Sequence, residues 1–119
     1  MGRSIMRTST RGKEEYVAAF WMARAKIRDM EGQKRYAEIL GRIVGAHPHE
    51  TLARSGKFQV LEGSHYFDRY FLHKFPSMEA ALAFYHSPEY QEAAAIRRAS
   101  CDGCELVIME GEAIFKGSL

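Results

Sequence analysis

The stretch FPSMEAALAFYHSPEY, residues 75–90, constrains the fold more than any other, because proline occurs twice in it beside serine. Pro76 follows an apolar and aromatic run that begins near Arg69 and favours a β-strand. Proline lacks an N–H, so the strand ends there. Ser77 is a good N-cap, and apolar residues then recur at the spacing of one helix face. We therefore predict a strand that leads directly into a helix.

The same helix is predicted to break before Pro88. The residue before a proline is pushed out of the helical region, whereas Pro88 suits the first turn of a new helix with Ser87 as its N-cap. Tyr85, Ser87 and Tyr90 then cluster at the break. A helix N-terminus with free N–H groups can hold an anion, so Ser87 and Tyr90 are candidate ligand-binding residues. Plain capping and aromatic packing are the alternative.

The rest of the chain supplies three further strands and one further helix. Their order is strand, helix, strand, strand, helix, strand, which is typical of an α+β, ferredoxin-like βαββαβ unit with an antiparallel sheet and helices on one face. The predicted elements are a strand at 16–27, a helix from the Asp29 cap to Gly45, strand pieces at 50–54 and 57–62 joined by a bulge at Ser55-Gly56, a strand at 67–75, the broken helix at 77–100, a turn at Asp102-Gly103 and a strand at 105–109.

Several of these stretches resemble an uncharacterised bacterial family, domain of unknown function 1330. The resemblance is carried by FPSMEAALAFYHSPEYQ, the basic pair Arg97 and Arg98, LVIMEG at 106–111, FWMAR at 20–24 and ARSGKFQVLEG at 53–63. It implies a dimeric α/β barrel, in which the sheets of two copies pack face to face. A homodimer would cover the sheet face that has no helices. The resemblance also implies a pocket between sheet and helices or at the barrel rim, and it implies no activity.

Charge is distributed unevenly along the 119 residues, a length that suits one domain. Residues 1–13 contain four basic residues and no acid, so the remainder holds 13 basic and 15 acidic residues although the whole chain is at +2. We predict a disordered basic tail at 1–13, with a targeting peptide or a docking arm as alternatives, and a single domain at 14–119. No basic cluster falls within that domain, so no nucleic-acid partner is expected.

The hydropathy pattern excludes membrane proteins of the helical class. No apolar run is long enough to span a bilayer, and the first residues lack the apolar core and cleavage site of a signal peptide. We therefore expect a cytoplasmic protein with no membrane partner.

Two residues are the leading candidates for chemistry. His73 lies inside the aromatic strand, and a histidine that faces a cavity suits a general base because its pKa is near neutral. The alternative is a hydrogen-bonded core histidine. Arg54 matches an arginine of the resembling family, and its guanidinium fork suits a carboxylate or phosphate. A salt bridge to an acid such as Glu62 is the alternative.

The cysteine and histidine pairs are weaker signals. Cys101 and Cys104 form a CxxC, but zinc needs four ligands, and a redox thiolate is disfavoured after a helix C-terminus. Two free thiols are the simplest interpretation. His47 and His49 flank a proline and could chelate, but capping of the preceding helix explains them equally. We therefore assign no metal ligands.

No nucleotide-binding glycine loop, HExxH or GxSxG motif occurs, and no cofactor is predicted. The favoured hypothesis is a homodimeric, cofactor-independent enzyme acting on a small organic acid or carbonyl compound, in an isomerase-, cyclase- or monooxygenase-like role. Arg54 would anchor the substrate, Tyr85 would orient it and His73 would move a proton. The alternative is a non-enzymatic dimeric module that binds a small molecule or a protein. A third hypothesis is a metal-sensing dimer that uses Cys101 and Cys104.

Overall fold

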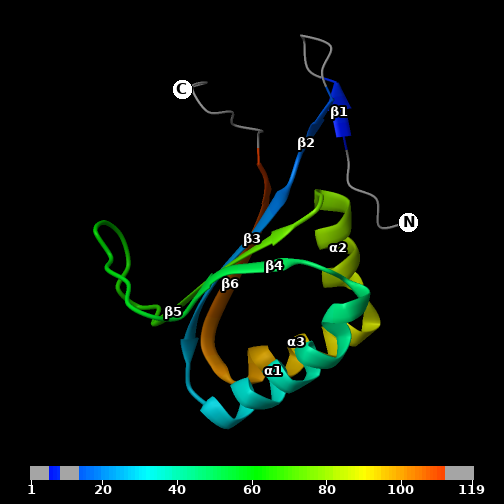
Figure 1. Cartoon of the computed structure of the whole chain (residues 1–119). Helices are drawn as coiled ribbons and strands as arrows, with labels where there is room; N and C mark the ends of the chain where they lie inside the picture. The colour runs from blue at the N-terminus through cyan, green and yellow to red at the C-terminus, as the bar shows by residue number, and fades with distance from the viewer. Residues whose placement is uncertain (1–5, 9–13, 112–119) are drawn as a thin grey trace.

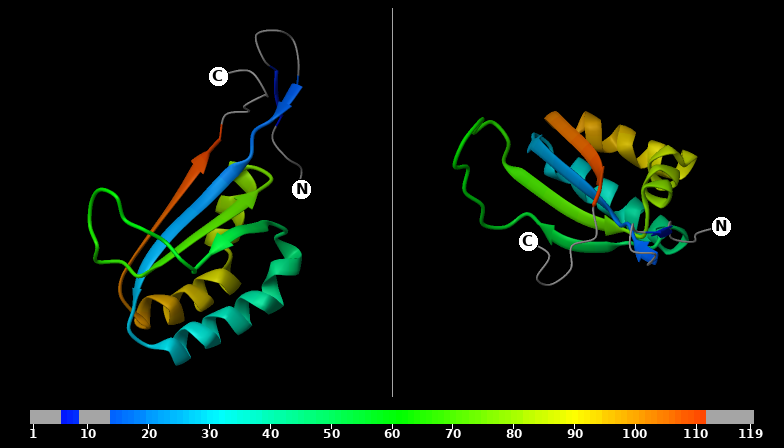
Figure 2. Two further views of the ribbon diagram at one scale, coloured as in Figure 1. Left: turned by 60° about the vertical axis from the view of Figure 1, so that its left-hand side comes forward. Right: turned by 90° about the horizontal axis from the view of Figure 1, so that it is seen from above.

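An antiparallel sheet of four strands carries the helices on one of its faces (Figure 1, Figure 2). The computed structural model describes residues 6–8 and 14–111. The strand order is β4-β5-β3-β6, and the element order confirms the predicted ferredoxin-like fold. The elements are β3 (Ala19–Ile27), α1 (Met30–Ile43), the short 3-10 helix η1 (Val44–Ala46), β4 (Glu50–Arg54), β5 (Arg69–Phe75), α2 (Met78–His86), α3 (Pro88–Ala99) and β6 (Cys101–Glu110).

A separate pair of short strands precedes β3. Met6–Thr8 (β1) pairs antiparallel with Glu14–Tyr16 (β2), and the first strand of the main sheet begins only at Ala19. The predicted disordered tail, residues 1–13, otherwise lies outside the described residues. The single strand predicted at 16–27 is thus shorter than expected at its start.

Serine side chains cap the start of the broken helix and its break, as the sequence predicts. The Ser77 hydroxyl accepts a hydrogen bond from the N–H of Ala80 at 3.0 Å and caps α2. The Ser87 hydroxyl accepts from the N–H of Tyr90 at 3.1 Å and donates to the carbonyl of Phe84 at 2.8 Å. Ser87 therefore ends α2 and begins α3 at once, with Pro88 in the first turn.

The segment between β4 and β5, residues 55–68, is a loop that projects from the body of the molecule (Figure 1). The strand predicted at 57–62 is wrong, because the chain turns out of the ladder directly after β4. Ser55 and Gly56 have φ values of 41° and 147°, in the left-handed region that ends an extended strand. The predicted bulge lies earlier, between Thr51 and Ala53.

β6 follows α3 without the predicted turn at Asp102-Gly103. Gly103 pairs with Lys26, while Cys101 pairs with the next residue, Ile27, so the register shifts by one. Asp102 is the additional residue of a β-bulge. The strand therefore begins at Cys101 rather than at position 105, because a bulge accommodates the glycine within the ladder.

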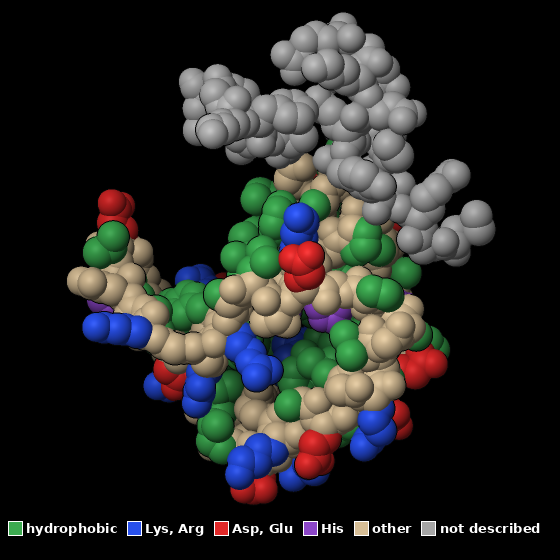
Figure 3. Space-filling view, viewed as in Figure 1, with side chains coloured by type: hydrophobic (Ala, Val, Ile, Leu, Met, Phe, Trp, Pro, Cys, Tyr) green, Lys and Arg blue, Asp and Glu red, His purple; other side chains and the backbone are tan. Residues whose placement is uncertain are grey.

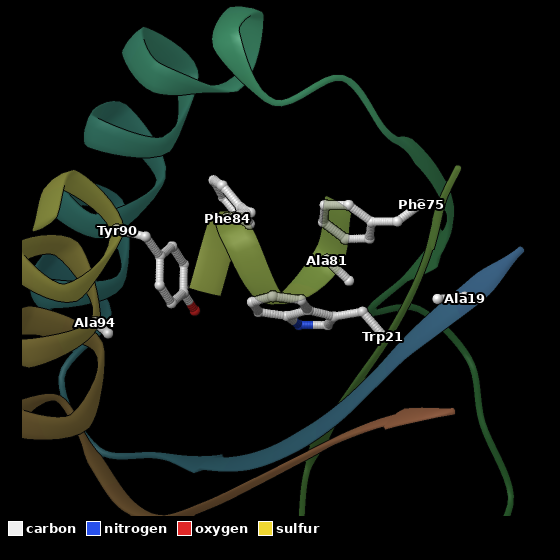
Figure 4. Close-up of a cluster of buried hydrophobic side chains, with 7 residues drawn as sticks. All are labelled: Ala19, Trp21, Phe75, Ala81, Phe84, Tyr90 and Ala94. Atoms are coloured by element: carbon white, nitrogen blue, oxygen red, sulfur yellow. The ribbon is translucent and has the colours of Figure 1, made fainter. Parts of the chain in front are cut away.

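Aromatic side chains dominate the core between the sheet and the helices (Figure 4). The Trp21 ring stacks on Phe75 at a centroid distance of 5.6 Å and meets the edge of Tyr90 at 5.4 Å. In Figure 4 the Tyr90 hydroxyl points from α3 toward Trp21 and the sheet. The cavity described below lies beside this core, and Trp21 and Tyr90 belong to both. The small residues of the cluster are Ala19, Ala81 and Ala94.

The opposite face of the sheet has no helix over it. Alternation along the strands places five apolar side chains there, and Val107 and Met109 remain 58% and 51% exposed. The 55–68 loop covers only the end of this face near Arg24 and Tyr70, where Phe67 and Phe58 contact them. Exposed apolar patches of the kind that remains mark interaction surfaces. We call it the outer-face patch: Phe20, Met22, Leu72, Val107 and Met109.

Candidate functional site

A cavity of about 140 Å³ lies between the inner face of the sheet and helices α1 and α3. Figure 3 shows a hollow lined by apolar side chains, with histidine and basic side chains at its edge. Its apolar walls include Trp21, Phe71 and Leu40. The polar and thiol-bearing lining residues that carry its chemistry are Gln33, Tyr36, Arg54, His73, Tyr90, Arg97 and Cys104.

Strand pairing brings His73 and Arg54 to the same cavity. His73 is paired with Thr51, and Arg54 with Phe71, so the two residues point to the helix side of adjacent strands. The Thr51 hydroxyl and His73 Nδ1 are hydrogen-bonded at 3.0 Å. This bond holds the ring in place and leaves Nε2 for a ligand.

His73 is a neutral imidazole at pH 7. Burial, the nearby His49 and the Arg54 guanidinium together lower the pKa of His73 from 6.5 to about 4, and burial is the largest of the three causes. The His49 ring lies edge-on to it, with centroids 5.4 Å apart. A neutral ring with a free nitrogen can accept a proton or a hydrogen bond from a ligand.

Arg54 is exposed at the edge of the cavity and has no ion-pair partner among the described residues. The alternative salt bridge to Glu62 is therefore not formed. Glu105, the acidic residue among those that line the cavity, instead binds Arg24 through a 2.8 Å contact on the other face of the sheet. The Arg54 guanidinium is free to bind an anionic ligand.

The other end of the cavity is formed by α1, α3 and β6. The Tyr36 and Tyr90 hydroxyls are hydrogen-bonded at 3.0 Å. Burial raises the pKa of Tyr36 well above its usual value, and Tyr90 raises it further, while Arg97 acts in the opposite direction. Arg97 Nη1 donates to Cys104 Sγ at 3.2 Å, and its guanidinium lies 5.9 Å from the Tyr36 ring centroid. We call this group the inner cluster.

One atom of the inner cluster lacks a partner. Arg97 Nε is buried and makes no hydrogen bond in the described structure. Burial alone lowers the pKa of Arg97, but Tyr90, Tyr36 and Cys104 raise it by more, so the guanidinium stays charged. From the sequence alone no role is assigned to Arg97. Its position in the family-like basic pair was the only available signal.

The structure separates the five predicted site residues into two groups. Arg54, His73 and Tyr90 line the cavity. Tyr85 lines a second, open depression beside α2 instead, although its ring centroid is 6.0 Å from that of Trp21. The Ser87 hydroxyl is fully used in the helix caps, which matches the capping alternative.

The cysteines and the histidine pair do not meet. Both thiols are free, and burial raises the pKa of Cys101. His49 Nδ1 lies 2.9 Å from the carbonyl oxygen of His47, and the His49 ring stacks on Phe75 at 4.4 Å. Across the described ranges no three histidine, cysteine or acidic side chains come together as a metal site.

The comparisons with known proteins agree on the fold. A family model described as Domain of unknown function (DUF1330) matches residues 18–112. A protein of unknown function from Rhodopseudomonas palustris has a TM-score of 0.69 at 16% identity, over 87% of this chain and 89% of that one. No curated protein matches.

Two further solved structures are similar at low identity. A dimeric ferredoxin-like protein of unknown function from Jannaschia sp. CCS1 has a TM-score of 0.65 at 20% identity, over 79% of this chain and 99% of that one. A hydroxynitrile lyase from Passiflora edulis has a TM-score of 0.63 at 14% identity, over 86% of this chain and 100% of that one. No helix in the described residues is long and apolar enough to cross a membrane.

Proposed function

Since this chain belongs to the DUF1330 family of unknown function, we propose its activity from the chemistry of its own cavity. The proposed activity is cofactor-independent proton transfer on a small organic acid or carbonyl compound. The observation that carries it is a neutral histidine, His73, in the same apolar cavity as an unpaired arginine, Arg54. Apolar cavities with a few convergent polar groups are the usual form of small-molecule sites.

The cavity volume limits the size of the substrate. An engineered cavity of about 150 Å³ accommodates benzene, so about 140 Å³ suits a compound of similar size. The open edge at Arg54 allows a charged group to extend outward. A nucleotide-sized substrate is too large for this site.

The proposed mechanism divides the work between the two ends of the cavity. Arg54 binds the carboxylate of the substrate as a bidentate fork. His73 Nε2 takes a proton from the carbon beside the carbonyl group, and the positive charge of Arg97 in the inner cluster stabilises the negative charge that develops on the carbonyl oxygen. Return of the proton to a different carbon completes an isomerisation.

Substrate binding strengthens the base in this scheme. The charge of Arg54 is one cause of the low pKa of His73. A carboxylate bound at Arg54 offsets that charge, so the pKa of His73 rises toward neutrality when the substrate arrives. A base with a pKa near the working pH is the more effective catalyst.

The fold and the outer-face patch support the assembly part of the proposal. A hydroxynitrile lyase has a similar fold, which supports small-molecule chemistry on a fold of this kind. A similar solved structure is that of a dimeric protein, which supports a homodimer. We propose that two copies pack through their outer-face patches as a homodimer. Such packing removes the exposed side chains of Val107 and Met109 from water.

A binding module without turnover is the second candidate. It is favoured by the low pKa of His73, because a base that holds its proton so weakly is a poor catalyst before a ligand arrives. In that case the same cavity would bind a small anion and release it unchanged.

Solvent deuterium exchange tests proton transfer directly. Pyruvate and levulinate, as first members of a panel of small oxo acids, are incubated with the protein in deuterated buffer and followed by NMR. We expect enzyme-dependent exchange that falls roughly 100-fold or more in His73→Gln. His65→Gln, at an exposed loop position, is the matched control. Equal exchange in wild type and His73→Gln would refute the role of His73, and binding without exchange would favour the binding module.

A further inference from the structure

We propose that the inner cluster is a second anion-binding subsite, so that the natural ligand carries a carboxylate at each end. Arg97, Tyr36 and Tyr90 would bind one carboxylate at the inner end, and Arg54 would bind the other at the open edge. The inference deepens the proposed function and rests on it only in using the same cavity. The ligand class is therefore a small dicarboxylic acid.

The first support is the unpaired charge of Arg97. Its guanidinium touches a thiol and the face of a tyrosine ring, and no carboxylate of the described chain pairs with it. A partly buried cation without a counterion is costly, and its buried Nε adds an unsatisfied donor. A ligand carboxylate at the guanidinium would supply the counterion.

The second support is the hydrogen-bond count of the tyrosine pair. Each hydroxyl has one hydrogen, and the single bond between Tyr36 and Tyr90 uses only one of the two. The other hydrogen is available for an acceptor. The raised pKa of Tyr36 keeps that hydroxyl protonated, so it can donate to a carboxylate oxygen at neutral pH.

The third support is the charge balance of the cavity lining. Among the described residues neither Arg54 nor Arg97 has an ion-pair partner, and His73 is neutral. Glu105 belongs to a strand of the cavity wall, but it pairs with Arg24 on the other face of the sheet. The cavity therefore has two positive charges that no side chain of the lining neutralises. A dianion complements this charge, whereas a monoanion would leave one arginine without a counterion.

Cys104 has a positioning role in this subsite. Its sulfur accepts from Arg97 Nη1 at 3.2 Å, which directs the guanidinium along the cavity. The sulfur is a weak acceptor, so it fixes the orientation of Arg97 without neutralising its charge. Hydrogen bonding with Tyr90 also raises the pKa of Arg97, so Cys104 and Tyr90 both act on the guanidinium.

Calorimetric titration with matched acids tests the subsite. The probes are succinate and glutarate, with butyrate as the matched monocarboxylate, titrated into wild type, Arg97→Gln and Arg98→Gln. Arg98 is the exposed neighbour outside the cavity and serves as the control. We expect one of the dicarboxylates to bind roughly 10- to 100-fold more tightly than butyrate in wild type and in Arg98→Gln. In Arg97→Gln that difference should disappear while butyrate affinity stays unchanged.

Two further variants separate binding from folding. Tyr36→Phe removes one hydroxyl and should lower the affinity for the dicarboxylate by about 10-fold. Arg97→Lys keeps the charge without the fork and should retain part of the preference. Three outcomes would overturn the proposal. The wild type could bind dicarboxylate and butyrate with equal affinity, it could bind neither at millimolar concentration, or Arg97→Gln and Arg98→Gln could have equal effects. If the wild type prefers a dicarboxylate over butyrate but catalyses no deuterium exchange, the proposed function is refuted and the second subsite is not.

Discussion

At the scale of single residues, His73 illustrates how neighbours decide chemistry. A histidine in an aromatic strand can be a core residue or a base, and the pKa of about 4 places this one among neutral, partly buried rings. Its hydrogen bond to Thr51 and its proximity to Arg54 come from strand pairing. Because burial and these neighbours lower the pKa of His73, the stability of the fold should depend on pH.

Acid should destabilise the fold through His73. Its pKa is 6.5 when unfolded and about 4 when folded, so the unfolded chain binds the proton first as the pH falls. The stability contributed by the neutral ring is therefore complete above pH 6.5 and is lost between 6.5 and about 4. The loss should be about 1–2 kcal/mol after solvent screening.

Urea unfolding at pH 7 and pH 4.5 measures this loss. His73→Gln cannot bind the proton, so its stability should fall less than that of wild type over the same interval. His65→Gln removes an exposed loop histidine and should behave as wild type. If the pH dependence of His73→Gln equals that of the control, the folded-state pKa of His73 is not lowered.

At the scale of elements, the helix packing depends on one close approach. Gly32, in the first turn of α1, lies where α1 meets the end of α3. A Cβ at this position would lie 2.6 Å from the Cβ of Ser100. Sequence propensity alone marks Gly32 as a weakness of the helix, whereas the structure shows that the missing side chain lets the two helices meet.

Alanine substitutions at the two glycines of α1 should have opposite effects. Gly41 has no atom within 4 Å of its Cβ position, so Gly41→Ala should stabilise the protein by about 0.5–1 kcal/mol. Gly32→Ala should destabilise it by about 1–3 kcal/mol, because the backbone of α1 must move away from Ser100. Thermal unfolding of both variants gives the comparison, and stabilisation by both would contradict the close approach.

At the scale of the whole molecule, the sheet face without helices is the surface through which two copies are proposed to associate. Helices cover one face of the sheet only (Figure 2), and strand alternation puts the outer-face patch on the other. The Arg24–Glu105 ion pair lies beside that patch on the same face. A second copy would cover the patch in the same way that the helices cover the inner face.

A charge in the outer-face patch should separate the proposed dimer. Val107→Glu places a carboxylate within the patch that the second copy would cover, and desolvation of that charge should weaken association by several kcal/mol. Sedimentation velocity should give a dimer for wild type and a monomer for Val107→Glu. Leu82→Glu, at a 41% exposed position of α2, is the control and should remain dimeric. A monomeric wild type would exclude this assembly.

Much of the fold could be predicted because its boundaries are local events. The prolines and serines of residues 75–90 end β5, cap α2 and begin α3 through contacts within four residues of each other. The loop conformation of residues 57–62 could not be predicted in this way, since their apolar residues resemble those of a strand. They do not form a strand because no described strand pairs with them. Whether a strand forms depends on its partner.

The sequence alone was enough to predict the order of elements, the break at Ser87 and three of the polar residues that line the cavity: Arg54, His73 and Tyr90. Only the tertiary structure decided that Tyr36 and Arg97 join them. The physical reason is distance along the chain: periodicity shows which face of a helix is apolar, but not which side chain of another element it meets. The Tyr36 and Tyr90 hydroxyls meet across 54 positions because α1 and α3 pack side by side.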